Sequence, residues 1–177
     1  MKPEFAIIAA ACVALAACSP AKKDDASAVG GAKFSTNVPM SEYMGHVVDP
    51  AAFLYWHNSG SDITAEGEKE RYPTTDEGWD VLVTGATTLI EAGNTLQLPH
   101  RVRQPAADWN KYAQLLSERA TTALAAAEKH DKQAVFEEGG KLYEVCVACH
   151  EQFVIEPQLE SSGPAEGDPL PKLPQKK

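Results

Sequence analysis

The stretch that decides the fold is residues 135–153, which read VFEEGGKLYEVCVACHEQF. Apolar residues, a glycine and two cysteines recur there at alternating spacings of four and three: Val135, Gly139, Leu142, Cys146, Cys149 and Phe153. This period predicts an amphipathic helix that buries one stripe, with Asp131 as its N-cap. Cys146 and Cys149 lie on that stripe, and His150 lies one turn above Cys146. All three side chains are therefore expected close to the interior.

Residues 146–150 form the pattern Cys-x-x-Cys-His, the attachment signature of a c-type haem. Cys146 and Cys149 can each form a thioether to the porphyrin, and His150 can bind the iron as the proximal axial ligand. The motif predicts one covalent haem c per chain. Gly139 and Gly140 either leave space for a neighbour or for the porphyrin, or make a flexible joint.

Two other sites use the same cysteine spacing. A thioredoxin-like dithiol needs alternating strands and helices, and this chain shows no convincing strand. A structural zinc site needs four ligands, but the two remaining cysteines, Cys12 and Cys18, lie in a targeting segment. The sequence therefore favours covalent haem over both alternatives.

The N-terminus is typical of an exported protein. Lys2 and an apolar run over residues 5–17 predict a signal peptide, residues 1–17, too short to span a bilayer comfortably. The sequence Leu-Ala-Ala-Cys at residues 15–18 resembles a bacterial lipobox, in which Cys18 is lipidated. The alternative is ordinary cleavage nearby, which leaves Cys18 free. We expect a periplasmic protein that Cys18 anchors to a bacterial membrane.

The chain is acidic, with 16 Lys and Arg against 25 Asp and Glu and a formal charge of −9. Loss of residues 1–17 removes one Lys and one Glu, so this charge is unchanged. Such a surface favours a redox partner with a basic surface and disfavours nucleic acid and anionic membrane surfaces. Contact with the membrane is then expected through lipid alone.

Composition divides the rest of the chain into three parts. Residues 18–37 are small and polar and predict a flexible tether, and residues 157–177 predict a disordered tail rich in Pro and Lys. Residues 38–156 remain as one folded domain with one core. A polar loop over residues 59–73 is assigned no chemistry.

Three further segments of this domain show a helical period. Residues 79–96 follow a capping box at Thr74 and Glu77, and residues 109–127 follow a possible cap at Asp108. Residues 40–58 are interrupted by Pro50, which predicts a kink or a restart with Asp49 as the cap. With the C-terminal helix these segments predict an all-α fold, an antiparallel four-helix bundle that carries haem on its last helix.

Trp79 and Trp109 fall on the predicted core stripes, and Trp56 lies beside one. The basic cluster His100-Arg101-Val102-Arg103 stands between two prolines. It could meet haem propionates or an acidic partner, but the usual fate of loop charges favours a solvated loop.

Four segments together resemble the cytochrome c prime family: residues 42–50 (EYMGHVVDP), 92–96 (AGNTL), 108–112 (DWNKY) and 146–153 (CVACHEQF). The likeness spans about residues 40–155, with the haem motif near the end of the fourth helix. It implies a periplasmic haem protein with His150 on one side of the iron and the first helix on the other. It also implies a possible homodimer, since relatives often pair through their first two helices.

The residue opposite His150 decides the function that this resemblance implies. Relatives with an apolar residue there bind nitric oxide or carbon monoxide, and relatives with methionine transfer electrons. The candidates here are Met44, Met40 and His46. The remaining alternative is that no protein side chain binds the iron at this position. On a helical wheel Met40 and Met44 are about 40° apart, whereas His46 is about 200° beyond Met44. The apolar stripe favours Met44 as ligand and electron transfer as function, although a methionine on such a stripe can also serve core packing.

An enzyme such as a peroxidase would need an acid-base group beside a vacant iron position. The stripe of the first helix offers none there. We therefore expect a protein that is not an enzyme and has no catalytic residue.

Overall fold

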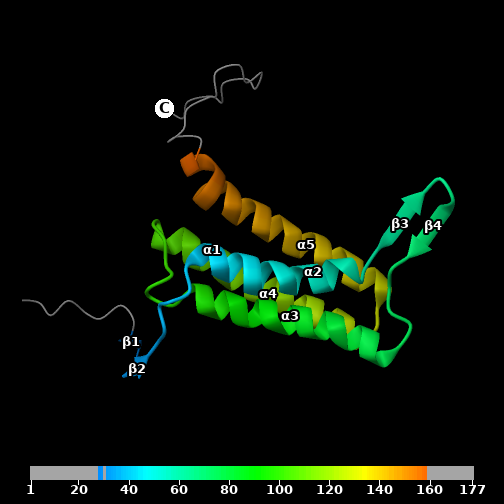
Figure 1. The fold of residues 1–177 in the computed structure, drawn as a ribbon, viewed down its shortest axis with the longest axis horizontal. Coiled ribbons are helices and arrows are strands. Elements are labelled where there is room, and N and C mark those ends of the chain that lie inside the picture. The colour runs from blue at the N-terminus through cyan, green and yellow to red at the C-terminus, as the bar shows by residue number, and fades with distance from the viewer. Residues whose placement is uncertain (1–27, 30, 159–177) are drawn as a thin grey trace, which may run out of the picture.

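The computed structural model describes residues 28–29 and 31–158. The predicted signal peptide, the lipidation site at Cys18 and most of the tether and tail lie outside these residues. The described chain is mostly helical, which fits the predicted all-α class (Figure 1). Within it, no helix combines the length and apolar character that crossing a membrane requires.

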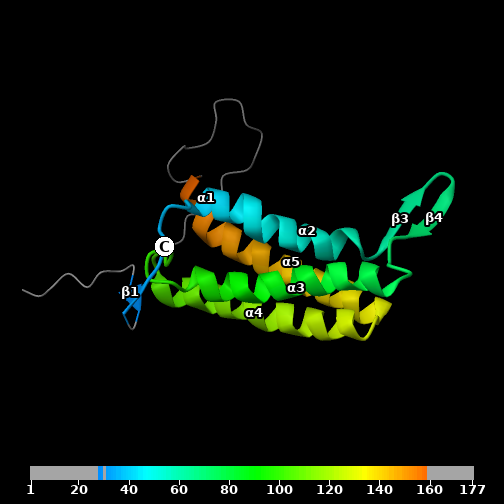
Figure 2. The ribbon, with the colours of Figure 1, turned by 60° about the horizontal axis from the view of Figure 1, so that its bottom comes forward.

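Four long helical segments form the body of the molecule. The first is continuous and consists of α1 (Met40–Tyr43), the π-helical turn η1 (Met44–Val48) and α2 (Asp49–His57). The others are α3 (Asp76–Leu96), α4 (Ala106–Glu128) and α5 (Lys132–His150), which runs into a second π-helical turn, η2 (Glu151–Ile155). Helix α2 packs on α3, α3 on α4, α4 on α5 and α5 on α2 (Figure 2).

Of the kink or restart predicted at Pro50, the restart with Asp49 as the cap is wrong, because Asp49 is itself helical. Its backbone has φ −61° and ψ −47°, and its N–H donates to the carbonyl of Met44, five residues back. Proline has no N–H to donate, and in a regular helix its ring clashes with the carbonyl four residues earlier. The wider π turn before Pro50 accommodates the proline without ending the helix.

Two of the other three predicted caps are also misplaced. Helix α3 is capped by Thr75, whose Oγ1 accepts a hydrogen bond from the Gly78 N–H at 3.2 Å, and not by Thr74. Helix α4 begins directly after Pro105, so Asp108 lies in its first turn. The Asp108 carboxylate instead accepts from Gln152 at 2.9 Å. For α5 the prediction is confirmed, since Asp131 accepts from the Ala134 N–H at 3.0 Å.

The segment predicted as a polar loop contains a hairpin of β3 (Ser61–Thr64) and β4 (Gly67–Glu70). The strands are antiparallel, with Ser61 opposite Glu70, and Gly67 takes φ +127° after the turn. The hairpin projects from one end of the helices (Figure 1). A shorter pair, β1 (Ala28–Val29) and β2 (Ala32–Lys33), lies within the predicted tether. At the other end, helix persists to Gln158, past the predicted start of the tail.

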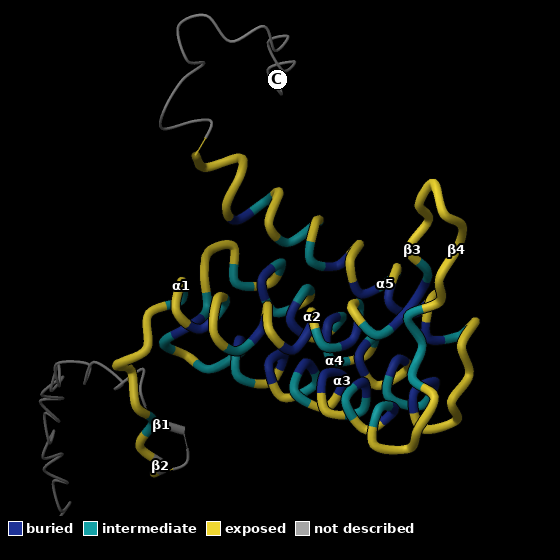
Figure 3. Tube along the Cα trace, turned by 45° about the vertical axis from the view of Figure 1, so that its right-hand side comes forward, coloured by how far each residue is buried: buried dark blue, intermediate teal, exposed yellow. Residues whose placement is uncertain are grey.

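The core lies where the four helical segments face each other (Figure 3). Its largest fully buried side chains are Tyr55, Leu82, Leu89, Leu142 and Val135. Trp79 and Trp109 are buried as predicted. Gly139 makes space for a neighbour, because its carbonyl accepts from the Trp56 indole at 2.9 Å and its Cα faces that ring.

Candidate cofactor pocket

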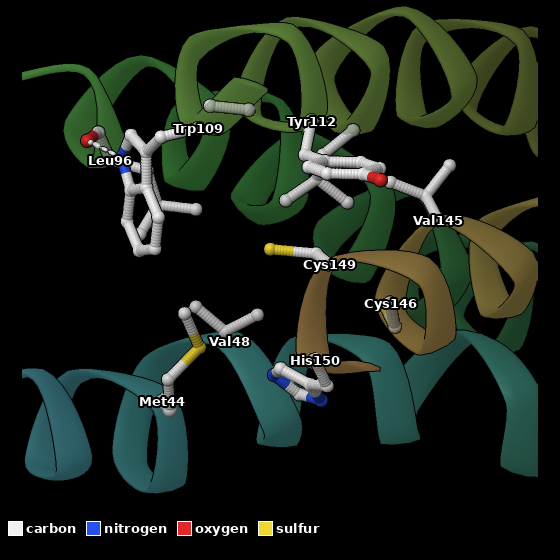
Figure 4. A pocket seen from close by; sticks show the side chains of 11 residues that line it. Met44, Val48, Leu96, Trp109, Tyr112, Val145, Cys146, Cys149 and His150 are labelled. Atoms are coloured by element: carbon white, nitrogen blue, oxygen red, sulfur yellow. Dashed lines mark hydrogen bonds between the residues drawn. The ribbon is translucent and has the colours of Figure 1, made fainter. Parts of the chain in front are cut away.

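A pocket opens at the end of the helices opposite the hairpin, between α5 and the first helix. Its empty volume, which includes open solvent at the mouth, is about 440 Å³. The lining residues are mostly apolar: Met44, Val48, Leu96, Trp109, Tyr112, Ala113, Leu116, Val145, Cys146, Cys149 and His150 (Figure 4).

The pocket exists because two helices separate there. Helix α2 contacts α5, but the π turn η1, which continues the same helix, contacts α3 and makes no backbone contact with α5 in the described chain. The end of α5 that carries the Cys-x-x-Cys-His motif diverges from the first helix (Figure 1). The motif therefore borders a gap that no side chain of the described residues fills.

Both cysteines of the motif line this gap from α5 as free, half-buried thiols. The Cys149 side chain points into the space (Figure 4). Burial raises the pKa of the Cys149 thiol to about 11, and Cys146 adds to the rise while Arg103 opposes it. Burial also raises the pKa of Cys146. Both thiols are protonated at neutral pH in the chain without cofactor.

His150 is the last residue of α5, and the π turn η2 starts immediately after it. Its ring lies on the side of α5 that faces the first helix (Figure 4). His150 is exposed, whereas the two cysteines are half-buried. The imidazole thus stands at the mouth of the pocket.

Of the three candidates for the opposite iron position, only Met44 lines the pocket. Its thioether extends from η1 toward the interior, beside Val48 (Figure 4). Met40 packs against the core without lining the pocket. His46 points away, since its side chain is 77% exposed and its Nε2 lies 3.1 Å from the Glu42 carboxylate.

Helices α3 and α4 supply the remaining wall. The Trp109 indole donates to the carbonyl of Leu96 at 2.7 Å, which ties α4 to the end of α3. Phe153, in η2, stands edge-on to Trp109 with ring centroids 5.1 Å apart, and edge-on to Tyr112 at 6.3 Å. Trp109 and Tyr112 were predicted on one buried stripe, but the spacing alone did not indicate that they border a cavity.

The basic cluster between α3 and α4 is not the solvated loop that the sequence favoured. Arg101 is only 9% exposed, and its guanidinium lies 4.3 Å from the centroid of the Tyr43 ring. Arg103 is exposed, but its guanidinium lies 5.7 Å from the Trp109 ring and donates to the carbonyl of Phe153 at 3.4 Å. The contacts with Tyr43 and Phe153 join segments far apart in the chain, so local sequence does not reveal them.

The residues around the gap fit a covalently held haem. Two thiols on one helix, an imidazole next to them and an otherwise apolar lining are the donors and the surface that this group requires. The described residues hold no group of three or more His, Cys, Asp or Glu side chains suited to a metal ion.

Comparison with protein-family models, with curated proteins and with solved structures gives no match to this chain.

Proposed function

We propose that this chain is a c-type haem protein of the bacterial cell envelope that transfers electrons. Cys146 and Cys149 would hold the haem through thioethers, with His150 and Met44 as its axial ligands. In this proposal the fold is an antiparallel four-helix bundle related to cytochrome c prime, with haem on its C-terminal helix.

The observation that carries the proposal is the placement of Met44 across one apolar gap from Cys146, Cys149 and His150. The thioether and the thiols come from different helices that have no backbone contact with each other at this point. When bound, a haem takes up or gives up a single electron. Cys146, Cys149 and His150 would attach and orient it, and the apolar lining would cover part of its surface.

A thioether opposite an imidazole raises the reduction potential and occupies the position that a gas would need. The proposal therefore predicts a six-coordinate, low-spin spectrum. Addition of carbon monoxide to the reduced protein should leave this spectrum almost unchanged.

The assignment of Met44 is tested by Met44→Ala, with Met40→Ala as the matched control on the same helix. We expect Met44→Ala to convert the iron to a high-spin form whose reduced spectrum changes strongly with carbon monoxide. Met40→Ala should behave as the unaltered protein does. A low-spin, gas-insensitive spectrum in Met44→Ala would remove Met44 from this role.

A second function is a five-coordinate haem that binds or scavenges nitric oxide or carbon monoxide. It is favoured by Val48, which lines the same wall as Met44 and offers iron no ligand. In that case the unaltered protein would be high-spin, and carbon monoxide would change its reduced spectrum.

The proposal also places the protein at a membrane, held by lipid on Cys18, where its acidic surface would meet a redox partner with a basic surface. Labelled fatty acid should enter the unaltered protein and not Cys18→Ser. Equal labelling of the two would reject the anchor. A homodimer through the first two helices stays a prediction that sedimentation can test.

A further inference from the structure

Arg101 is a buried cation without a counter-charge. Arg101 is 9% exposed, and its Nε is fully buried with no hydrogen-bond partner. No carboxylate of the described residues forms an ion pair with it. A buried charge normally requires a partner, and an acidic chain could have supplied one.

An acidic side chain that acts on the same tyrosine is engaged elsewhere. The charge of Glu91 raises the pKa of Tyr43, whereas the charge of Arg101 lowers it. The Glu91 carboxylate, however, accepts a hydrogen bond from Asn94 at 3.3 Å. The Arg101 guanidinium instead lies over the face of Tyr43, at 4.3 Å from the ring centroid. This contact orients the guanidinium, but it cannot replace the hydrogen-bonding of its N–H groups.

The Arg101 side chain lies at the end of the helices that carries the pocket. Tyr43, beneath it, directly precedes Met44, and the hydroxyl of Tyr43 donates to the carbonyl of Ala92 at 3.4 Å. Arg101 itself follows five residues after Leu96, which lines the pocket. A second cation of the same loop, Arg103, lies over the pocket residue Trp109. Its charge opposes the rise in the pKa of Cys149 that burial causes.

We propose that Arg101 and Arg103 bind the two propionate carboxylates of the haem. The inference rests on the proposed function, because it assigns the counter-ions of the same pocket. The porphyrin brings its own two anions, and guanidinium is the side chain best suited to carboxylate because it can present two parallel N–H donors. The loop between α3 and α4 would thereby hold the propionate groups of the haem.

The test uses the full-length protein with haem attached and compares Arg101→Gln, Arg103→Gln and Arg101→Lys. Lys129→Gln serves as the charge control, because Lys129 is exposed at the opposite end of α4. The reduction potential is measured for each. Infrared difference spectra between the oxidised and reduced forms are recorded with haem labelled with ¹³C at the propionate carboxyl groups.

We expect Arg101→Gln to lower the potential, since an uncompensated carboxylate favours the more positive ferric iron. Its labelled carboxylate bands should shift relative to the unaltered protein. Arg101→Lys should restore most of the potential, and Lys129→Gln should change neither measurement. If Arg101→Gln does not fold, the inference is tested with Arg103→Gln, because Arg103 is exposed. This variant should show a smaller fall in potential and a shift of the labelled bands.

Labelled bands that stay in place in both Gln variants would overturn the inference, even if the potential moved. So would a potential that changes in Lys129→Gln as much as in Arg101→Gln. Both outcomes leave the haem assignment intact. A purified protein that carries no haem at all would overturn the proposed function and this inference together.

Discussion

At the residue scale, the buried cysteine thiols of the pocket make the stability of the haem-free chain depend on pH. The pKa of the Cys149 thiol is about 11 in the fold against an ordinary value of 9.0, because burial disfavours the thiolate. The folded state therefore holds this proton more tightly than the unfolded state does. The resulting stability is fully present below about pH 9 and is lost as the pH rises through about 11.

We therefore expect the haem-free chain to lose free energy of unfolding between about pH 9 and pH 11 in urea titrations. Cys149→Ser, which removes the thiol, should show a weaker loss over the same range. The haem-bearing protein has thioethers that cannot ionise and should lack this component. The explanation fails if the haem-free chain and Cys149→Ser have the same pH profile.

Residue roles could be predicted only where they follow from one helix. The stripe of the first helix favoured Met44 over His46, and the structure gives Met44 alone of the three candidates a place on the pocket wall. The usual fate of loop charges predicted a solvated Arg101. The structure differs because its partner, Tyr43, belongs to a segment far away in the chain. Such long-range contacts leave no local pattern to detect.

At the element scale, α3 and α4 approach each other closely at Gly93. A Cβ built at Gly93 would collide with the Ser117 side chain and lie 2.5 Å from the carbonyl of Ala113. Gly93→Ala should therefore destabilise the protein by about 1–3 kcal/mol, as overpacking typically does. Urea titration of the haem-bearing protein measures this change.

Gly140→Ala is the matched control, because a Cβ at this exposed position meets nothing within 4 Å. Alanine favours helix over glycine, so this variant should be more stable by up to about 1 kcal/mol. Equal effects of the two substitutions would mean that helix propensity, and not the contact between α3 and α4, determines the outcome at Gly93.

The long elements could be predicted because each buries one stripe at the helical period. The hairpin could not, because its strands bury neither face: Ile63, its one large apolar residue, is 82% exposed. The π turn η1 also escaped prediction, since a change from one hydrogen-bond spacing to the next leaves the composition of the segment unaltered. Pro50 indicated an irregularity there but not its kind.

At the scale of the whole molecule, the hairpin projects from the end of the helices remote from α1 (Figure 1). The pocket lies toward the α1 end, since Met44 and Val48 of η1 line it. Replacing residues 63–68 by a two-residue Asn-Gly turn keeps the pair Asp62 and Lys69 and removes the projecting tip. We expect the visible spectrum and the reduction potential to stay the same. A changed iron coordination in this variant would show that the two ends are coupled, contrary to the layout described above.

Covalent attachment of haem by Cys146 and Cys149 is tested by the intact mass of the purified, exported protein under denaturing conditions. We expect the mass of the processed chain plus one haem, with the added mass lost when both cysteines are replaced by alanine. A processed chain whose mass includes no haem, or a haem that remains bound under denaturing conditions without these two cysteines, would contradict it.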